Sequence, residues 1–438
     1  MKKLISLFIC AILLSSGFAG FGVIEAAALS EAPAVAAEGA VLIKYSTGEV
    51  LFEKNKDEKL FPASTTKVLT GLIALEKLDM DTVVTVDAEA ASTDGSRIYL
   101  SEGEQVTVEQ LINAMLIYSA NDAAIALAKE ISGSVEEFAV LMNSKAKELG
   151  AVNSNFTTPN GLPDENHYTT AYDLALITRA AMQNNMFRQI VGTYEYKIPA
   201  TNKYQARTLT NTNRLFWDNN TQIESNGYVR TLKYEGATGI KTGYTAAAGN
   251  CLVAGANRQG TEFIAVILQS QPTVYFADAI RLFDYGYNNY YFALQYDPDE
   301  PLGTIKVKGG AVDKVDVVCA EWIGEVISID QSEDVVTTDI KIKKSLKAPF
   351  EAGTTVGAVK LYYNGELEKE YTLITATDSE ASSIGTMAVS FKENVPTFLK
   401  VITFITLALL IGYLSLVIKV NRTAARRRKE RKARKNTR

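Results

Sequence analysis

Histidine is almost absent from this sequence, since His167 is the only one among 438 residues. A hydrolase with a serine, histidine and carboxylate triad would have to use His167 as its base, and the chain has no Gly-x-Ser-x-Gly turn to present such a serine. A zinc site usually needs two or more His or Cys ligands, so we expect neither a metal site nor another cofactor. His167 is expected to be a structural or capping residue.

Cysteine is also scarce, with three in the whole chain. Cys10 follows Ile9 in an apolar N-terminal run, where a lipid-modified cysteine would be expected to follow a small residue, so no lipid anchor is expected. Cys251 and Cys319 fall in different predicted domains. This placement argues against a disulfide and predicts two buried thiols.

Positive charge is concentrated at one end of the chain. Residues 419–438 hold eleven Lys or Arg and one Glu, a net charge of +10, and residues 1–28 carry +1. The total is −5, so residues 29–400 carry −16. A domain this acidic gives no reason to expect nucleic-acid binding. The basic tail could bind nucleic acid, but its place beside an apolar run favours contact with anionic lipid.

Two apolar runs lie near the ends of the chain. Lys2 and Lys3 precede the run Leu4–Leu14, and small residues follow up to Ala28, which is typical of a secretory signal peptide at 1–28. The second run, Val401–Ile418, has eighteen residues without a charge.

At ~1.5 Å per residue this second run just spans a bilayer core, and we predict a transmembrane helix at 398–418. A buried core helix is the alternative. The basic flank at 419–438 favours the membrane interpretation and places the tail in the cytoplasm, with the bulk of the chain outside.

The sequence between the two apolar runs predicts two domains. After a linker at 29–39, alternating residues in Ala40–Lys54 predict a hairpin. Helical periodicity covers 64–78, 108–131, 135–149 and 170–182, and strand alternation returns at 240–245, 250–258 and 262–269 before a helix at 273–285. We therefore predict an α+β domain at 40–296, with an antiparallel sheet, helices on its faces and an inserted helical subdomain.

A small all-β domain is expected at 297–376, followed by a linker at 377–397. Its evidence is a turn-rich boundary at 297–301 and six short alternating runs, at 304–308, 314–318, 325–329, 339–342, 356–362 and 370–374. It carries no catalytic constellation, so spacing or docking is its expected role.

A nucleophilic serine without a histidine needs another base, and a lysine one helical turn away can serve. In Ser64-Thr65-Thr66-Lys67 the i, i+3 spacing places both side chains on one face. Pro62 and Ala63 lead from the hairpin into the helix, so Ser64 stands at a helix N-terminus, which favours developing negative charge. A second match, Ser144 to Lys147, lies in a charged amphipathic helix and is taken as solvated surface.

Two further triplets follow in the chain. Ser119-Ala120-Asn121 marks the break between two helical runs, and Lys241-Thr242-Gly243 opens the first strand after the helical insertion. With Ser64-x-x-Lys67 they resemble the three motifs of penicillin-recognising serine enzymes, whose fold is shared by β-lactamases and transpeptidases. The phrases that resemble D-alanyl-D-alanine carboxypeptidases, low-molecular-mass penicillin-binding proteins, are Phe61–Lys67, Ser119–Ala124, His167–Ala175 and Lys241–Thr245. The resemblance covers about Ala40 to Tyr287.

The resemblance implies three catalytic residues. Ser64 would be the acylated nucleophile and Lys67 its general base, which must be neutral to accept a proton. Burial and the ammonium of Lys241 would both lower the pKa of Lys67. Ser119 would relay the proton to the leaving nitrogen.

It also implies a substrate-binding set. Asn121 would hold the substrate amide, and Lys241 and Thr242 would face the terminal carboxylate. Gly243 would let the strand approach the substrate closely, and the backbone NH groups of Ser64 and Tyr244 would form the oxyanion hole. The implied partners are peptidoglycan stem peptides and β-lactam antibiotics.

Two features depart from the family pattern. Relatives often place a basic residue just before the C-terminal helix, where this chain has Tyr275, with Arg281 further along. Relatives are often tethered by an amphipathic helix, whereas this chain is predicted to cross the membrane.

Two other functions share the motifs: a class A-like β-lactamase, with Glu165 as the nearest candidate carboxylate, and a catalytically idle wall-binding scaffold.

Overall fold

The computed structural model describes residues 29–435, of which 383–398 and 430–435 are described by their backbone alone. The chain divides into two compact units, Met1–Ala293 with Gly324–Val336 and Leu294–Ile323 with Thr337–Arg438. The predicted signal peptide, 1–28, lies outside the described residues, as do the last three residues of the tail.

A five-stranded antiparallel sheet organises the first unit, in the order β2-β1-β11-β10-β9. Its strands are β1 (Gly39–Lys44), β2 (Val50–Lys54), β9 (Ala237–Thr245), β10 (Gly249–Arg258) and β11 (Thr261–Ser270). The predicted hairpin is confirmed, and β1 pairs with β11 from Gly39↔Leu268 to Lys44↔Phe263. Segments from both ends of the unit thus share one sheet, which confirms the predicted insertion, and β9 is an edge strand.

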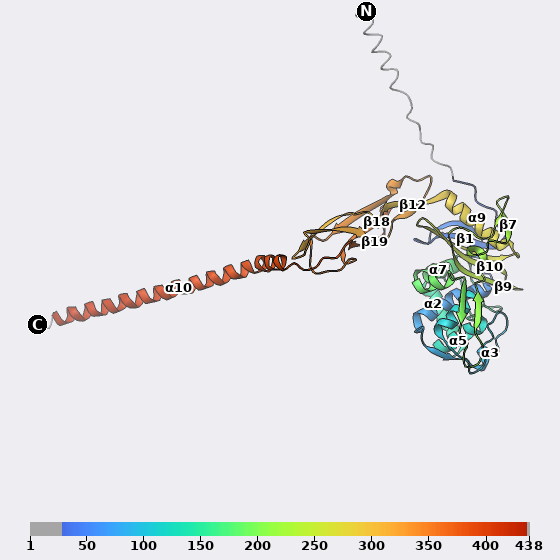
Figure 1. The fold of residues 1–438 in the computed structure, drawn as a ribbon, viewed down its shortest axis with the longest axis horizontal. Helices are drawn as coiled ribbons and strands as arrows, with labels where there is room; N and C mark the ends of the chain where they lie inside the picture. The colour runs from blue at the N-terminus through green and yellow to red at the C-terminus, as the bar shows by residue number, and fades with distance from the viewer. Residues whose placement is uncertain (1–28, 436–438) are drawn as a thin grey trace, which may run out of the picture. The chain divides into compact units, whose positions relative to one another are not determined.

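Alternate residues of the central strands face two separate cores. On β11, Ile264 and Val266 face a core shared with α2 (Lys67–Lys77) and α7 (Ala171–Gln183). Phe263 and Ala265 face the opposite core, which α9 (Val274–Asn289) covers. Figure 1 shows α9 on one side of the sheet and the helical insertion on the other. Because both faces are buried, the strand sequences are almost continuously apolar.

The insertion contains the predicted helices and several short elements that the sequence did not indicate. The helices are α3 (Ala88–Ala91), α4 (Val108–Ile117), α5 (Asn121–Ser132), α6 (Val135–Glu148) and α8 (Asn185–Val191), with 3₁₀ turns η1 (Ala63–Thr66) and η2 (Arg214–Phe216). The short hairpins pair β3 (Val83–Thr85) with β4 (Gln105–Thr107), β5 (Glu195–Ile198) with β6 (Arg207–Thr210), and β7 (Gln222–Ser225) with β8 (Tyr228–Thr231).

Side-chain caps set where two of these helices begin. At α4, Thr107 Oγ1 accepts from Gln110 N at 3.2 Å, and the Gln110 side chain accepts from Thr107 N at 3.1 Å, which forms a capping box. At α7, Thr170 Oγ1 accepts from Asp173 N at 3.0 Å. The polar residues that open these helices satisfy backbone donors that would otherwise lack partners.

The second unit holds a six-stranded sheet in the order β16-β18-β19-β14-β13-β17. Its strands are β13 (Gly303–Lys308), β14 (Lys314–Cys319), β16 (Val336–Ile342), β17 (Ser345–Lys347), β18 (Thr355–Tyr363) and β19 (Glu366–Thr375). Val317, Val356 and Leu373 lie in its interior. The run expected at 325–329 forms β15 (Ile323–Ser328), which pairs with β12 (Tyr290–Tyr296) and not with this sheet.

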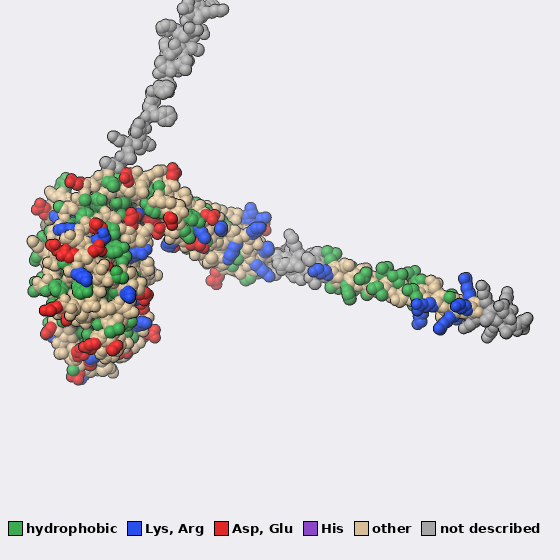
Figure 2. All heavy atoms as spheres, turned by 180° about the vertical axis from the view of Figure 1, so that it is seen from behind, with side chains coloured by type: hydrophobic (Ala, Val, Ile, Leu, Met, Phe, Trp, Pro, Cys, Tyr) green, Lys and Arg blue, Asp and Glu red, His purple; other side chains and the backbone are tan. Residues whose placement is uncertain are grey.

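A single helix, α10 (Ser383–Lys435), ends the described chain. Its segment Leu399–Lys429 contains an 18-residue window with a mean hydropathy of 2.6 that is not buried, so the helix is long and apolar enough to cross a membrane. This exposure does not support the alternative of a buried core helix. The hydroxyl of Thr406 donates to Ile402 O, and that of Ser415 to Ile411 O, which satisfies polar groups inside the helix. Figure 2 shows the apolar side chains of this segment followed by clustered Lys and Arg.

Candidate active site

The candidate nucleophile lies in a 3₁₀ turn and not in the first turn of an α-helix. Ser64 belongs to η1, and α2 begins at Lys67. In a 3₁₀ turn the side chains at i and i+3 eclipse each other, and Lys67 Nζ lies 2.9 Å from Ser64 Oγ. Ala63, at the start of the turn, has φ +48°, a strained conformation for a residue with a side chain.

Lys67 is fully buried, and three groups surround its amine. Nζ lies 2.9 Å from Ser64 Oγ, 2.7 Å from Asn121 Oδ1 and 2.6 Å from Asn160 O. The Asn121 amide is oriented by its Nδ2, which donates to Asp94 O at 2.7 Å. Asn121 Oδ1 and Asn160 O can only accept hydrogen bonds, so they take two N–H groups of Lys67. The third direction of the amine points at the Ser64 hydroxyl.

The surroundings of Lys67 favour its neutral form. Burial is the largest cause that lowers its pKa well below the usual value, and the positive charge of Lys241 lowers it further, while Asp122 acts in the opposite direction. A neutral amine has two N–H groups and one lone pair. Because two acceptors already fix the N–H groups, the lone pair faces Ser64 Oγ and can accept its proton.

Lys241 is a second buried lysine, on the edge strand β9. Its Nζ donates to Thr242 O at 3.0 Å, and burial lowers its pKa to about 7. A bound carboxylate would favour the ammonium form of this lysine. The neighbouring Thr242 Oγ1 donates to Thr212 Oγ1 at 2.7 Å, which ties β9 to the loop that contains η2.

Gly243 allows β9 to lie directly against the nucleophile turn. A β-carbon at Gly243 would stand 3.0 Å from both Pro62 O and Ser64 N. Across the sheet its partner is Cys251, whose buried thiol lies 3.6 Å from Phe61 O. The sequence suggested that this glycine admits substrate, and the structure adds that it admits the backbone of Ser64.

The contacts of Ser119 and Tyr244 give less direct evidence for their predicted roles. Ser119 lies in the break between α4 and α5 with φ +68°, and its side chain is nearly buried. In the described part of the chain, no hydrogen bond joins its hydroxyl to Ser64 or Lys67. Tyr244 follows Gly243 on the edge strand, and its side chain is 65% exposed.

His167 holds the segment that supplies Asn160 to the site. Its Nδ1 accepts from Thr157 N at 3.0 Å, so Nε2 carries the proton and donates to Thr66 Oγ1 at 2.8 Å. Burial lowers the pKa of His167 to about 4, so the ring is neutral at physiological pH. Gly161 is needed here because a β-carbon would stand 1.9 Å from Ala63 O. His167 thus has a structural role, as expected.

Asp122 lies within the motif Ser119–Ala124, and no role was predicted for it. Its carboxylate is fully buried and accepts from Ile98 N at 3.1 Å, Leu100 N at 3.0 Å and Ala123 N at 3.0 Å. Burial raises its pKa, while these backbone donors oppose the rise. Asp122 therefore anchors the loop before β4 to the start of α5.

Tyr275 stands where relatives often have a basic residue, and the nearby Arg281 does not replace that residue. Arg281 Nη1 donates to Asp278 Oδ1 at 2.8 Å, and Asp278 in turn accepts from Ala37 N at 3.0 Å. Burial raises the pKa of Tyr275, and the positive charge of Arg214 opposes this. Arg214 is itself bonded to Asp218. Arg281 is therefore committed to the fold.

The β-lactamase alternative needs a carboxylate near the nucleophile. Glu165 is exposed, in the turn after the segment that approaches Lys67. That segment offers Lys67 the carbonyl of Asn160 and not a carboxylate. Among the side chains that the structure describes, no group of three or more His, Cys, Asp or Glu could hold a metal ion. The second Ser-x-x-Lys match is surface, because Ser144 is exposed.

Comparison with known proteins identifies the family. The sequence model of the D-alanyl-D-alanine carboxypeptidases, peptidase family S11, matches residues 26–272, and that of the C-terminal domain of penicillin-binding protein 5 matches residues 294–381. The chain is 35% identical to D-alanyl-D-alanine carboxypeptidase DacF of Bacillus subtilis over 84% of its own length and 92% of the relative. It is 31% identical to DacC of Escherichia coli, over 80% and 86%.

Solved structures agree with these matches. Penicillin-binding protein 5 of Haemophilus influenzae aligns with a TM-score of 0.55 at 26% identity, over 80% of this chain and 99% of that one. The carboxypeptidase DacD of Francisella tularensis aligns with a TM-score of 0.55 at 27% identity, over 84% and 98%. The resemblance drawn from the motifs is confirmed, and the chain belongs to the peptidase S11 family of serine D-alanyl-D-alanine carboxypeptidases.

Proposed function

We propose that this protein removes the terminal D-alanine from peptidoglycan stem pentapeptides through an acyl-enzyme on Ser64. The observation that carries the proposal is the surroundings of Lys67. Two obligate acceptors occupy its N–H groups, and its third partner is the Ser64 hydroxyl at 2.9 Å. A buried amine held in this way is a general base directed at one serine.

In the acylation step, the Lys67 lone pair takes the Ser64 Oγ proton as Oγ attacks the carbonyl carbon of the penultimate residue. The tetrahedral oxyanion is stabilised by the backbone NH groups of Ser64 and Tyr244. The C–N bond then breaks, Ser119 passes a proton to the departing amine, and D-alanine leaves. Water hydrolyses the ester by the reverse sequence of proton transfers and restores the serine.

The edge strand β9 binds the substrate. Lys241 and Thr242 receive the terminal carboxylate, and Gly243 keeps the strand close to the nucleophile turn. Asn121 was expected to hold the substrate amide. Because Lys67 and Asp94 O already engage its oxygen and nitrogen, we assign it first to orienting Lys67.

The same residues account for acylation by β-lactams. A β-lactam presents a carboxylate and a strained amide to the same groups, but its amine stays tethered after the ring opens. The rival β-lactamase function would need fast hydrolysis of that ester, and the exposed Glu165 gives no support for it. An idle scaffold would not need a depressed pKa at Lys67.

We also propose that residues 398–418 span the cell membrane, with the catalytic unit outside and the basic residues 419–438 in the cytoplasm. The support is the apolar, unburied segment Leu399–Lys429 and the positive flank beyond it. Membrane attachment through this helix is compatible with peptidoglycan as the partner, and nothing in the acidic charge of 29–400 suggests a nucleic acid.

Two measurements on one protein test the enzymatic proposal. The purified protein should release D-alanine from a pentapeptide that ends in D-Ala-D-Ala, and a fluorescent penicillin should label it stably. A label that is rapidly lost would indicate a β-lactamase. If the protein is not labelled and releases no D-alanine, it would be a scaffold.

A further inference from the structure

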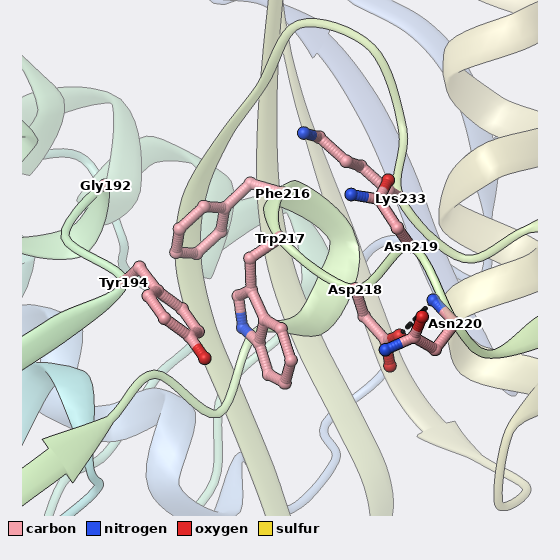
Figure 3. A pocket seen from close by; sticks show the side chains of 8 residues that line it. All are labelled: Gly192, Tyr194, Phe216, Trp217, Asp218, Asn219, Asn220 and Lys233. Atoms are coloured by element: carbon pink, nitrogen blue, oxygen red, sulfur yellow. Dashed lines mark hydrogen bonds between the residues drawn. The ribbon is translucent and has the colours of Figure 1, made fainter.

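An aromatic cleft lies beside the candidate active site. It has a volume of about 570 Å³ and is formed by the start of the segment after α8, by the η2 loop and by the segment before β9. Figure 3 shows its aromatic side chains on one side and its amide and amine side chains on the other. The side chains that give the cleft this character are those of Tyr194, Phe216, Trp217, Asn219, Asn220 and Lys233.

The aromatic side of the cleft is held in a fixed arrangement. Trp217 Nε1 donates to Asn211 O at 3.0 Å, which sets the orientation of the indole ring. The Tyr194 ring lies 5.1 Å from it, with the ring planes at 53°. Tyr194 is nearly half exposed and Trp217 is partly exposed. Two tilted, partly exposed rings offer a preformed apolar platform.

The polar side of the cleft offers free groups. Among the described residues, no hydrogen bond engages the side chains of Asn219, Asn220 or Lys233, and all three are exposed. Asp218 between them is different, because its carboxylate accepts from Thr221 N at 3.0 Å and pairs with Arg214. The groups left for a ligand are therefore two amides, which both donate and accept, and one cation.

The cleft is close to the proposed carboxylate site. The Thr242 hydroxyl is 2.7 Å from that of Thr212, and the carbonyl of the preceding Asn211 is 3.0 Å from Trp217 Nε1. Covalent geometry limits the distance between the Asn211 oxygen and the Thr212 hydroxyl to about 5 Å, so Trp217 Nε1 lies within about 11 Å of the Thr242 hydroxyl.

The direction of β9 determines which part of the peptidoglycan substrate can reach the cleft. On this strand the proposed carboxylate contacts, Lys241 and Thr242, precede the oxyanion residue Tyr244, so the leaving D-alanine lies toward the start of β9. Lys233 precedes that start. The stem peptide extends in the other direction, away from the cleft. A ligand in the cleft would therefore belong to a neighbouring strand of the polymer.

We propose that this cleft binds an N-acetylated amino sugar of a glycan strand next to the strand whose stem peptide is cut. The inference rests on the proposed function, which makes peptidoglycan the substrate. The C–H face of a pyranose ring packs on Tyr194 and Trp217, and its acetamide and hydroxyl groups bond to the amides and to Lys233. This second contact raises the effective concentration of the polymer at the active site.

The chain provides its own probe for this ligand, because it has two tryptophans and the other one, Trp322, lies in the second unit. In the full-length Trp322→Phe protein in detergent, the emission of Trp217 should shift saturably on titration with an N-acetylglucosamine tetramer. Adding Asn219→Ala and Lys233→Ala should weaken this binding at least about fivefold. Adding Tyr228→Ala, which removes a different exposed aromatic side chain on a hairpin tip, should not change it.

The kinetic test compares two substrates. With Asn219→Ala and Lys233→Ala, kcat/KM for a soluble pentapeptide should match the parent, while D-alanine release from intact peptidoglycan should fall at least about fivefold. The inference is overturned if the tetramer does not shift the emission, if a sugar-free stem peptide displaces it, or if both substrates slow equally. Failure of the parent to release D-alanine from the pentapeptide would refute the proposed function and leave the sugar titration readable.

Discussion

Two buried lysines should give the acylation rate two opposite dependences on pH, a rise due to Lys67 and a decline due to Lys241. The substitution Lys241→Met should change both. Burial brings the pKa of Lys241 from 10.5 to about 7, which disfavours its ammonium by about 5 kcal/mol. Above pH 7 the protonated fraction falls about tenfold per pH unit, and attraction for a carboxylate falls with it. Lys67, whose pKa is well below its usual value, must lose its proton before it can act as a base. The acylation rate should therefore rise with pH as Lys67 loses its proton.

The assay is the second-order rate of acylation by a penicillin and by its methyl ester, measured between about pH 5 and 10, because this rate reports the pKa values of the free enzyme. For the parent, the free acid should show both the rise due to Lys67 and a decline that begins near pH 7, due to Lys241. The ester has no carboxylate to attract and should give the rising limb alone.

In Lys241→Met the decline should vanish, and the free acid should lose its advantage over the ester. The rising limb should also move to higher pH, since the positive charge of Lys241 is one of the causes that lower the pKa of Lys67. Lys44→Met is the matched control, because Lys44 is another buried lysine but pairs with Glu49 at 2.6 Å. The reasoning fails if the ester declines with the acid, or if the decline survives in Lys241→Met.

Four further outcomes follow from the structure. Ser64→Ala should abolish D-alanine release and the penicilloyl adduct seen by mass spectrometry, with a stability cost of about 1 to 2 kcal/mol from the lost hydrogen bond to Lys67, and an adduct on Ser144 would contradict the assignment. Gly243→Ala should slow acylation at least about tenfold, because its β-carbon would stand 3.0 Å from Ser64 N and displace it slightly, and a parental rate would show that this contact does not set the geometry. Deleting Phe398–Arg438 should yield a protein that no longer sediments with membranes but keeps its kcat/KM on a soluble pentapeptide, whereas lost activity would give the tail a part in the site. Glu165→Ala should leave the slow loss of a bound penicillin unchanged, and a slower loss would revive the β-lactamase interpretation.

The main sheet and its flanking helices could be predicted because their periodicity is strong. The hairpin at 40–54 alternates cleanly, and the strands β10 and β11 are long apolar runs bounded by turns. The short hairpins of the insertion were not predicted, because strands of three or four half-exposed residues contain too few positions to establish a period.

The residue types of the candidate site could be proposed from the sequence, but their contacts could not. The i, i+3 spacing linked Lys67 to Ser64, whereas the carbonyl of Asn160 reaches Lys67 from 93 residues away. A backbone carbonyl is the same in every residue, so no sequence pattern marks the one that binds. The left-handed φ of Ser119 and the contact between Thr212 and Thr242 likewise depend on how separate segments pack.

The protonation of Lys67 depends on residues that carry no charge. Three segments pack closely around η1: Gly243 abuts Ser64 N, Gly161 abuts Ala63 O, and Cys251 lies against Phe61 O. This packing leaves Lys67 fully buried, and burial is the largest cause of its lowered pKa. A side chain at either glycine would separate these backbones and admit water, which would stabilise the ammonium and remove the base. We therefore expect Gly243, within a motif, and Gly161, outside the motifs, to support the proposed base by excluding water from Lys67.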